Sequence, residues 1–470
     1  MPTSAPSDSH LGRAVGLSFR YQDLTWARHP QTKPAEHLLN AVYYNKEVHA
    51  SITSLCVRAH MKTPYKIGLL ASLYLSQGLP YGFFTQALPA LLRHHKVSLT
   101  VIGLTSLLSL TWAFKFIWAP LVDLFGSNRF GYRKSWIVPL QIGAALLLLS
   151  TSLIDPNTAL FMIVFIAFLT NLIAATQDVS TDALAIDLLT PEERGIGNGI
   201  QISGYRVGMV IGGGVLLMVF DSLGWANTFL VLGMALLLMI IPVTVHREKI
   251  HSAKPEAKNF KHRYIPMIFE AFQQPQMCPW LIVLFTYKAG DALGSAMLRP
   301  FLIDRGIKLA EIGWMLGTVG FSAGLIGAIV GGGVINLLGR TKSLVVFGST
   351  HALSMFLYAL PAAGMGSDAV LYGLCAAEYF AGSLASVALF THMMDRSRAE
   401  ASATDYTVQS STLAIAVGLV GATSGFLAES VGYTMLFVLA SSLGFAGVMV
   451  FIVINKIQFP SAKYAPKEIR

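Results

Sequence analysis

An apolar stretch in the first half of the chain carries side chains that could move protons or bind a polar solute. Residues 170–187 read TNLIAATQDVSTDALAID and continue an apolar run that begins near Leu160. At 100° per residue, Asp178 and Asp182 share one stripe of a helix with Asn171, and Gln177 lies beside that stripe. A carboxylate at bilayer depth costs roughly 2.5 to 3.5 kcal/mol, so two on one face indicate a water-filled cavity or cationic partners. The pattern predicts a solute or proton pathway; the alternative is an acid that only joins two helices.

The composition places this helix in a membrane protein. The chain is 54% hydrophobic and 13% charged, with a mean hydropathy of +0.57, which excludes a soluble domain of 470 residues. Its net charge of +9 does not indicate nucleic-acid binding, because the basic residues lie in short loops and tails between apolar spans. The three cysteines, Cys56, Cys278 and Cys375, have neither metal-ligand spacing nor a disulfide pattern. We therefore expect no cofactor, no metal and no redox chemistry.

Apolar segments of the length that a bilayer-crossing helix requires occur twelve times, as six, a break and six. We place them near 67–91, 98–122, 136–154, 158–188, 197–220, 226–245, 279–302, 311–336, 343–363, 367–394, 404–427 and 433–455. The predicted domains are a polar tail (1–60), a six-helix bundle (61–245), a cytoplasmic linker (246–278), a second six-helix bundle (279–455) and a cytoplasmic tail (456–470). The linker is expected to carry a short interfacial helix over 263–272. These patterns predict an all-α polytopic membrane protein.

The first 60 residues differ from the rest of the chain. They are polar and contain no apolar run long enough for a signal peptide. Met61 directly precedes a basic residue and the first spanning segment, so the tail is interpreted as disordered or as an artefact of the assigned start. A terminal peptide that begins before Met61 would exclude the artefact.

The loops differ in basic charge on the two sides of the membrane. If both termini are cytoplasmic, the opposite loops offer only Arg93, Lys96, Arg305 and Lys308, and most other basic residues lie on the cytoplasmic side. The positive-inside rule then fixes the orientation, in a membrane that we interpret as a bacterial inner (plasma) membrane. The pair His94 and His95 in the first external loop is interpreted as solvated surface rather than as a metal site.

An internal repeat relates the two bundles. APLVDLFG (119–126) after the second span matches GGVINLLG (332–339) after the eighth, which indicates duplication. Both segments resemble the loop motif G-x-x-x-D-x-x-G-[RK] of the major facilitator superfamily. The resemblance implies that Asp123 takes part in a cytoplasmic gate, whereas Asn336 cannot supply the charge. The gating residues it implies are Asp123, Arg133, Lys134, Asn336 and Arg340.

Eight charged residues lie deep inside predicted spans, four of them acids and four of them bases. They are Lys115, Asp178, Asp182, Arg206, Lys288, Asp291, Arg299 and Glu378. Unpaired charges at this depth would destabilise the fold, so they predict ion pairs or a charged cavity between the two bundles. The predicted hydrogen-bonding residues of such a cavity are Gln77, Gln177, Tyr205, Tyr287 and Gln409. It would suit a bulky polar or anionic solute.

Proton coupling would need an acid that gains and loses a proton near neutral pH. The candidates are Asp178, Asp182 and Glu378, and we favour the first two because neighbouring carboxylates raise one another's pKa. Lys288 and Asp291, three residues apart on one helix, are solute-binding candidates that could instead form a fixed salt bridge.

Glycines at four-residue spacing predict close helix packing. They are Gly204, Gly208 and Gly212 in the fifth span, and Gly313 with Gly317, Gly320 with Gly324 and Gly327 with Gly331 in the eighth.

Five segments together resemble one branch of the major facilitator superfamily, that of AmpG-type muropeptide permeases and acetyl-coenzyme A transporters. They are QGLPYG (77–82), KFIWAPLVD (115–123), TQDVSTD (176–182), YRVG (205–208) and YKAGD (287–291). The longer segment SQGLPYGFF (76–84) is also similar to permeases for iron-siderophores of the rhizobactin and pyochelin type, and a chain of 470 residues with twelve spans favours that group. The resemblance implies a major facilitator fold and proton-coupled import of an iron-siderophore or muropeptide-like solute by alternating access. Acetyl-coenzyme A transport remains an alternative.

Other classes of function have less support in the sequence. The sequence contains no Walker A motif that would indicate ATP-driven transport. It also contains no nucleophile-base set and no H-E-x-x-H motif that would indicate an enzyme. A non-transporting membrane sensor with fixed charges stays open, and would show no solute flux. We expect a monomer in a lipid bilayer whose partners are a small solute and protons.

Overall fold

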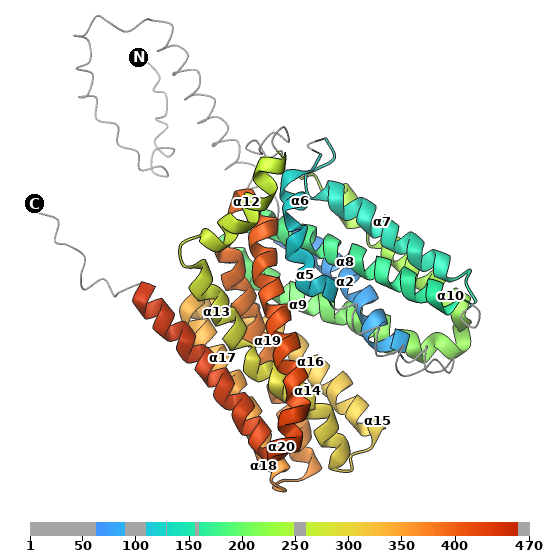
Figure 1. Cartoon of the computed structure of the whole chain (residues 1–470). Coiled ribbons are helices and arrows are strands. Elements are labelled where there is room, and N and C mark those ends of the chain that lie inside the picture. Colours follow the sequence, from blue (N-terminus) through green and yellow to red (C-terminus); the bar gives the residue numbers. More distant parts are fainter. Residues whose placement is uncertain (1–62, 90–109, 128, 156–158, 249–259, 459–470) are drawn as a thin grey trace, which may run out of the picture. The chain divides into compact units, whose positions relative to one another are not determined.

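The structure is a computed structural model and describes residues 63–89, 110–127, 129–155, 159–248 and 260–458 (Figure 1). Predictions about residues 1–60 and 459–470, the external loop with His94 and His95, and the first part of the predicted second span (98–109) lie outside the described residues. We call residues 63–248 the first half and 260–458 the second half. Within them the chain is helical, and its one β-bridge joins Ser127 to Gly131.

The first half contains short and long helices in series. They are α2 (Thr63–Gly82), η1 (Phe83–Ala87), α5 (Leu110–Phe114), η3 (Lys115–Ile117), α6 (Ala119–Leu124), α7 (Lys134–Thr151), α8 (Leu160–Leu188), η4 (Pro191–Glu193), α9 (Arg194–Val210), η5 (Ile211–Val215), α10 (Leu216–Leu238) and α11 (Ile241–Val245). The polar stretch 170–187 therefore lies within α8, as its apolar periodicity predicts.

The second half repeats this plan after a linker helix. Its helices are α12 (Phe260–Gln273), α13 (Met277–Tyr287), α14 (Ala289–Asp304), α15 (Leu309–Ile312), η7 (Gly313–Gly320), α16 (Phe321–Leu338), α17 (Arg340–Leu357), α18 (Ala359–Ala362), α19 (Asp368–Asp395), η8 (Ala399–Ala401) and α20 (Ser402–Gln458). Helix α12 is longer than the interfacial helix expected over 263–272, and α13 begins within the predicted linker.

The prediction of an all-α polytopic membrane protein is confirmed. Nine helical segments in the described part of the chain are long and apolar enough to cross a membrane. One of them contains α20, which breaks at Gly432 (φ 76°), between the predicted spans 404–427 and 433–455. Helix α10 breaks likewise at Gly224 (φ 70°), between the predicted spans 197–220 and 226–245. Only glycine adopts positive φ readily, which explains the residue at both breaks. The described helices are consistent with twelve spans.

Two lysines lie where a spanning helix is interrupted. Lys288 separates α13 from α14 and has φ −96° and ψ −5°, so the predicted span 279–302 is two helices. Lys115 begins the 3₁₀ turn η3, after Phe114 with φ −100° and ψ 2°. Irregular backbone at membrane depth is tolerated only where protein or a cavity surrounds it. Both breaks thus bring an ammonium group into the interior.

Glycines allow the close packing of α2 on α9. A Cβ atom on Gly208 would lie 2.3 Å from the Leu75 carbonyl oxygen, and one on Gly212 would lie 1.9 Å from that of Leu79. Gly327 likewise allows α16 to pack closely on α19, because a Cβ there would lie 2.4 Å from the Phe380 carbonyl oxygen. The prediction of close packing is wrong for Gly313 and Gly317 in the described part of the chain, because a Cβ there would meet none of its atoms within 4 Å.

The two halves share buried apolar surface. The largest buried cluster contains Leu70, Tyr74 and Ile186 from the first half with Trp280 and Leu389 from the second. Burial of such side chains stabilises by about 1.5 to 3 kcal/mol each. The charged groups of the site are therefore held between two bodies that pack on each other.

Candidate functional site

The two acids of α8 predicted to carry protons, Asp178 and Asp182, lie in different surroundings. Asp178 Oδ2 forms a buried ion pair with Lys115 Nζ, which also lies 5.2 Å from the centroid of the Trp112 ring. Asp182 Oδ1 instead accepts hydrogen bonds from the Tyr74 hydroxyl (2.9 Å) and from Gln201 Nε2 (3.1 Å). Within the described residues Asp182 has no ion-pair partner, so of these two acids it is the one held by neutral donors alone.

A cavity of about 420 Å³ lies where α9 meets the second half. It is lined by Arg206, Lys288, Asp291, Ser295, Ala296, Leu298, Arg299, Leu316, Glu378, Tyr379, Gly382 and Ser386. Three of these side chains are cationic and two are carboxylates, so charged groups of both signs face the cavity. Its volume falls within the range of about 300 to 1,000 Å³ that is usual for ligand sites. The cavity can hold an anionic solute, or the charged part of a larger one.

Arg206 is the cation of the first half that reaches this cavity. Its Nη1 atom is buried and has no hydrogen-bond partner in the described part of the chain, and its guanidinium carbon lies 5.9 Å from the centroid of the Tyr379 ring. A Cβ atom on Gly324 would lie 1.8 Å from Nη1, so glycine at that position leaves room for the guanidinium group. A buried donor without an acceptor costs about 1 to 3 kcal/mol, which an anionic ligand would recover.

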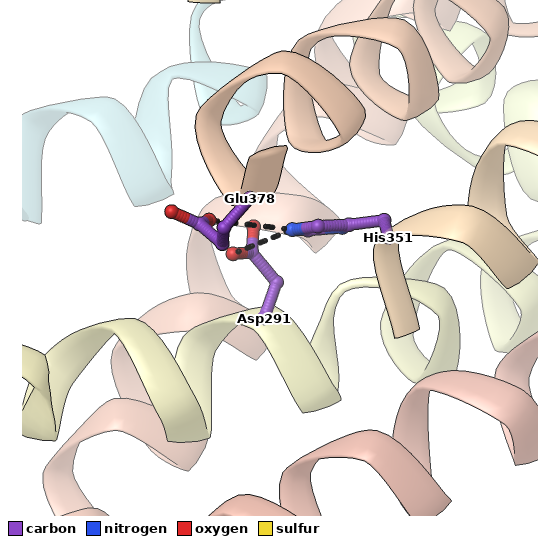
Figure 2. A group of neighbouring side chains, drawn as sticks. All are labelled: Asp291, His351 and Glu378. Carbon is purple, nitrogen blue, oxygen red and sulfur yellow. Dashed lines mark ion pairs between the residues drawn. The ribbon is translucent and has the colours of Figure 1, made fainter. Parts of the chain in front are cut away.

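The carboxylates of the cavity are joined to a histidine that the sequence analysis missed. Asp291 accepts hydrogen bonds from Lys288 Nζ (2.8 Å) and from the Ser295 hydroxyl (3.0 Å). His351 Nε2, on α17, lies 3.6 Å from Asp291 Oδ1 and 3.5 Å from Glu378 Oε1 (Figure 2). His351 lies inside the predicted span 343–363, and an ionisable residue at that depth was the available signal.

The predicted hydrogen-bonding residues are not among those that line this cavity. Gln177 Nε2 donates to Gln141 Oε1 (3.0 Å), and the Tyr287 hydroxyl donates to the Leu344 carbonyl oxygen (2.9 Å). Tyr205 packs on the ring of Tyr81, with centroids 5.5 Å apart.

Two glutamines complete that set and differ in how their amides are satisfied. Gln409 accepts from Trp280 Nε1 (2.7 Å) and donates to the Met393 carbonyl oxygen (3.2 Å). Gln77 is buried, and the described residues provide no hydrogen-bond partner for its amide nitrogen or its amide oxygen. Of the two, Gln77 is therefore the one whose amide group is left without a hydrogen bond in the described residues.

The ends of the helices that carry the repeated motif join the two halves. We call this the basic end: the end where α6 and α16 finish and α7 and α17 begin. Arg133 is fully buried there and donates to Asp123 (2.9 Å), Asp187 (3.0 Å) and the Ser402 hydroxyl (2.8 Å). Burial lowers the pKa of Arg133, but the Asp187 and Asp123 carboxylates raise it by more than burial lowers it, so the net shift is upward. The guanidinium thus stays charged and links α6, α8 and α20.

The second copy of the motif joins the halves differently. Asn336 donates to the Glu192 carbonyl oxygen (2.8 Å), and Arg340 donates to the Pro191 carbonyl oxygen. Asp395 accepts from Arg340 (2.9 Å) and from Arg194 (2.8 Å). This contact is partly exposed, in contrast to that of Arg133.

Lys134, the remaining gating candidate, lies within the first half, where its Nζ donates to the carbonyl oxygens of Thr244 (2.6 Å) and His246 (2.9 Å).

Comparison with known proteins agrees with this architecture. Residues 70–420 match the family model described as Major Facilitator Superfamily. The anhydromuropeptide permease of Escherichia coli (strain K12) is 28% identical over 390 residues, which cover 82% of this chain and 79% of that protein. The putative transporter AmpG 4 of Rickettsia conorii is 27% identical, over 83% and 97% of the two chains.

A solved structure has the same fold. The crystal structure of FucP, a Major Facilitator Superfamily transporter in the outward conformation, superposes with a TM-score of 0.64 at 13% identity. The superposition covers 82% of this chain and 98% of that one. At this identity the likeness concerns the fold alone.

Proposed function

The chain belongs to the major facilitator superfamily and is a multi-pass membrane transporter, and we propose that it imports a bulky polar or anionic solute together with protons. The observation that carries this proposal is the charged cavity, where Arg206, Lys288 and Arg299 lie beside two carboxylates. Transport rather than catalysis is supported by the relatives, which are named permeases and transporters.

The solute class that we propose is that of muropeptides. Such molecules carry sugar hydroxyls and several carboxylates, which suit a wall with three cations and two acids. The similarity to an anhydromuropeptide permease over most of both chains supports the same class. Iron-siderophores and acetyl-coenzyme A, which the sequence also suggested, become the competing solutes in the test.

Proton coupling is assigned to Asp178 and Asp182 of α8. Asp178 is neutralised by Lys115, whereas neutral donors alone hold Asp182, so a proton on Asp182 would change the net charge of this buried cluster. Such a change alters the cost of burying the cluster and can favour one conformation over another. A proton role for Glu378 stays a prediction.

Alternating access would break and remake the contacts at the basic end. The Arg133 network and the Asp395 bridge both join the first half to the second. Rocking of the halves about a midplane site requires these contacts to open when the cavity opens to that side. By the positive-inside argument, this side is cytoplasmic and both termini are inside. The membrane that we propose is a bacterial inner membrane, and the oligomeric state that we propose is a monomer.

Uptake into sealed proteoliposomes under an inward proton gradient tests the proposal. An anhydromuropeptide, an iron-siderophore and acetyl-coenzyme A are compared, with Asp178→Asn and Asp182→Asn as variants. We expect anhydromuropeptide uptake that an uncoupler abolishes and that both variants lose.

The control is Asp304→Asn, which changes an acid at the end of α14, far along the chain from the α8 cluster. Accumulation of a different solute would overturn the solute class. Uptake that is indifferent to the proton gradient would overturn the coupling, and absence of flux from folded, inserted protein would favour the sensor.

A further inference from the structure

We propose that Asp291, His351 and Glu378 form a binding site for one divalent transition-metal ion such as Zn²⁺ or Co²⁺. The three residues come from α14, α17 and α19, and their side chains point toward one another (Figure 2). One ligand atom from each, His351 Nε2 and a carboxylate oxygen from each acid, lies within 4.8 Å of the other two. The proposal goes beyond solute transport and does not depend on it.

The distances fit a metal site better than they fit hydrogen bonds. His351 Nε2 lies 3.6 Å from Asp291 Oδ1 and 3.5 Å from Glu378 Oε1. Both exceed the usual hydrogen-bond range of about 2.7 to 3.2 Å. Ligands at about 2.0 to 2.1 Å from a tetrahedral zinc ion lie roughly 3.3 to 3.4 Å from one another. Shifts of a few tenths of an ångström would therefore bring His351 Nε2 to this distance from both carboxylates, whose ligand oxygens lie within 4.8 Å of each other.

The imidazole is an independent indication of a ligand. His351 is 6% exposed, and its Nε2 atom has no hydrogen-bond partner among the described residues although it is aimed between two carboxylates. A Cβ atom on residue 382 would lie 3.0 Å from Nε2, so Gly382 leaves the space that the ring occupies. A buried polar atom with no partner calls for a ligand that the protein itself does not provide.

The Asp291 carboxylate is already oriented. Lys288 Nζ donates to its Oδ2 (2.8 Å), and the Ser295 hydroxyl donates to its Oδ1 (3.0 Å), the oxygen that faces His351. Outer hydrogen bonds of this kind fix a ligating group and raise metal affinity. Lys288 can keep its contact with Oδ2 while a metal ion binds Oδ1.

The charges leave room for one further cation. Lys288 compensates Asp291, whereas the described residues provide Glu378 with no ion-pair partner except His351. A metal ion at the centre would compensate Glu378. Imidazole with two carboxylates selects transition metals over Mg²⁺ and Ca²⁺, which prefer oxygen ligands alone.

The site would be open on the side of the cavity. Asp291 and Glu378 line the 420 Å³ cavity, while His351 lies in a smaller adjoining pocket that shares Asp291. Three protein ligands leave a tetrahedral ion one free position, for water or for an oxygen of a solute. The cavity also gives the ion its path of entry.

Metal binding to the purified full chain in detergent tests this proposal without any solute or gradient. Protein stripped with a chelator is titrated with Zn²⁺ in equilibrium dialysis, and with Co²⁺ while its visible absorption is recorded. Because the chain has twelve histidines, the site is measured as the difference from His351→Ala. The matched control is His392→Ala, which removes another buried imidazole whose Nε2 has no hydrogen-bond partner.

We expect one fewer tightly bound Zn²⁺ in His351→Ala, with loss of the tetrahedral Co²⁺ absorption and no change in His392→Ala. Glu378→Gln keeps the side-chain volume and should weaken binding about tenfold or more, so it decides the matter if His351→Ala does not fold. Equal Zn²⁺ stoichiometry and affinity in the wild type and in a folded site variant would overturn the proposal. Displacement of Zn²⁺ by equimolar Mg²⁺ or Ca²⁺ would overturn the class of metal.

Discussion

Thr404 donates two hydrogen bonds to one oxygen of Asp123, one from its backbone N–H and one from its hydroxyl, both 2.7 Å long. The two residues are 281 positions apart, at the end of α6 and the start of α20. The other oxygen of Asp123 accepts from Arg133 (2.9 Å). A carboxylate at a helix N-terminus also interacts favourably with the helix dipole. The predicted gating residue of the first half is thus a direct link to the second half.

Replacement of Asp123 by Asn should strongly destabilise this closed arrangement. The change leaves Arg133, which is fully buried, with one carboxylate fewer. Breaking a buried ion pair costs about 3 to 5 kcal/mol. We expect a clear fall in melting temperature, measured by tryptophan fluorescence, and greater reactivity of a cysteine introduced at Ala403.

Asp395→Asn is the matched comparison for this prediction. It removes an acid that also joins the halves, but whose pairs with Arg194 and Arg340 are partly exposed. Pairs of that kind contribute about 0 to 1 kcal/mol. Equal destabilisation by the two substitutions would contradict the importance assigned to the Asp123 network.

The pair of Lys115 and Asp178 should behave as a unit in stability measurements. Lys115→Gln leaves the Asp178 carboxylate buried without its cation, which we expect to cost about 3 to 5 kcal/mol. Adding Asp178→Asn removes the uncompensated charge and should recover most of that loss. Thermal unfolding of both single variants and the double variant measures the coupling. Additive losses would mean that the two groups do not interact.

Close packing of α2 on α9 predicts a position-specific effect of a single methyl group. Gly208→Ala would place Cβ 2.3 Å from the Leu75 carbonyl oxygen and should destabilise by about 1 to 3 kcal/mol. Gly214→Ala, on the adjoining η5, meets no atom of the described residues within 4 Å and should be neutral or slightly stabilising. Melting temperatures of the two variants give the comparison. A similar change in both would exclude the packing explanation.

Arg206 should matter for solute affinity more than for folding. Within the described residues its Nη1 atom has no hydrogen-bond partner, so Arg206→Gln removes little from the folded protein. Loss of a charge-assisted hydrogen bond to the solute costs about 1.5 to 3 kcal/mol, or roughly a 10- to 100-fold rise in KM for uptake. Arg206→Lys keeps the charge and should recover part of the affinity. Unchanged KM in Arg206→Gln would place the solute elsewhere.

The sequence allowed the fold and part of the site to be predicted, for physical reasons. Apolar length and glycine or basic residues at the ends identify spans without any tertiary information, and Asp178 stands out because a carboxylate in such a span is costly. The partner of Asp123 could not be found, because Thr404 lies 281 positions away and threonine is common at helix starts. Periodicity does not distinguish Gln409, held by Trp280, from a glutamine that faces a cavity.

His351 shows a different limit. At membrane depth, the prediction considered only lysine, arginine and the acids. The structure assigns His351 to the site because α17 places it between Asp291 and Glu378. The break at Lys288 likewise has no signal in local sequence, since no proline or glycine occupies it.

The breaks at Gly224 and Gly432 bear on how the protein is made. In each half a single residue of positive φ separates two long apolar segments, so hardly any polar chain lies between them. A connection this short favours insertion of each pair as a helical hairpin, because leaving one apolar member in water while the other enters the lipid is costly. Lengthening the turn at Gly432 would decouple the two insertion steps, and the last segment could then be left outside the membrane.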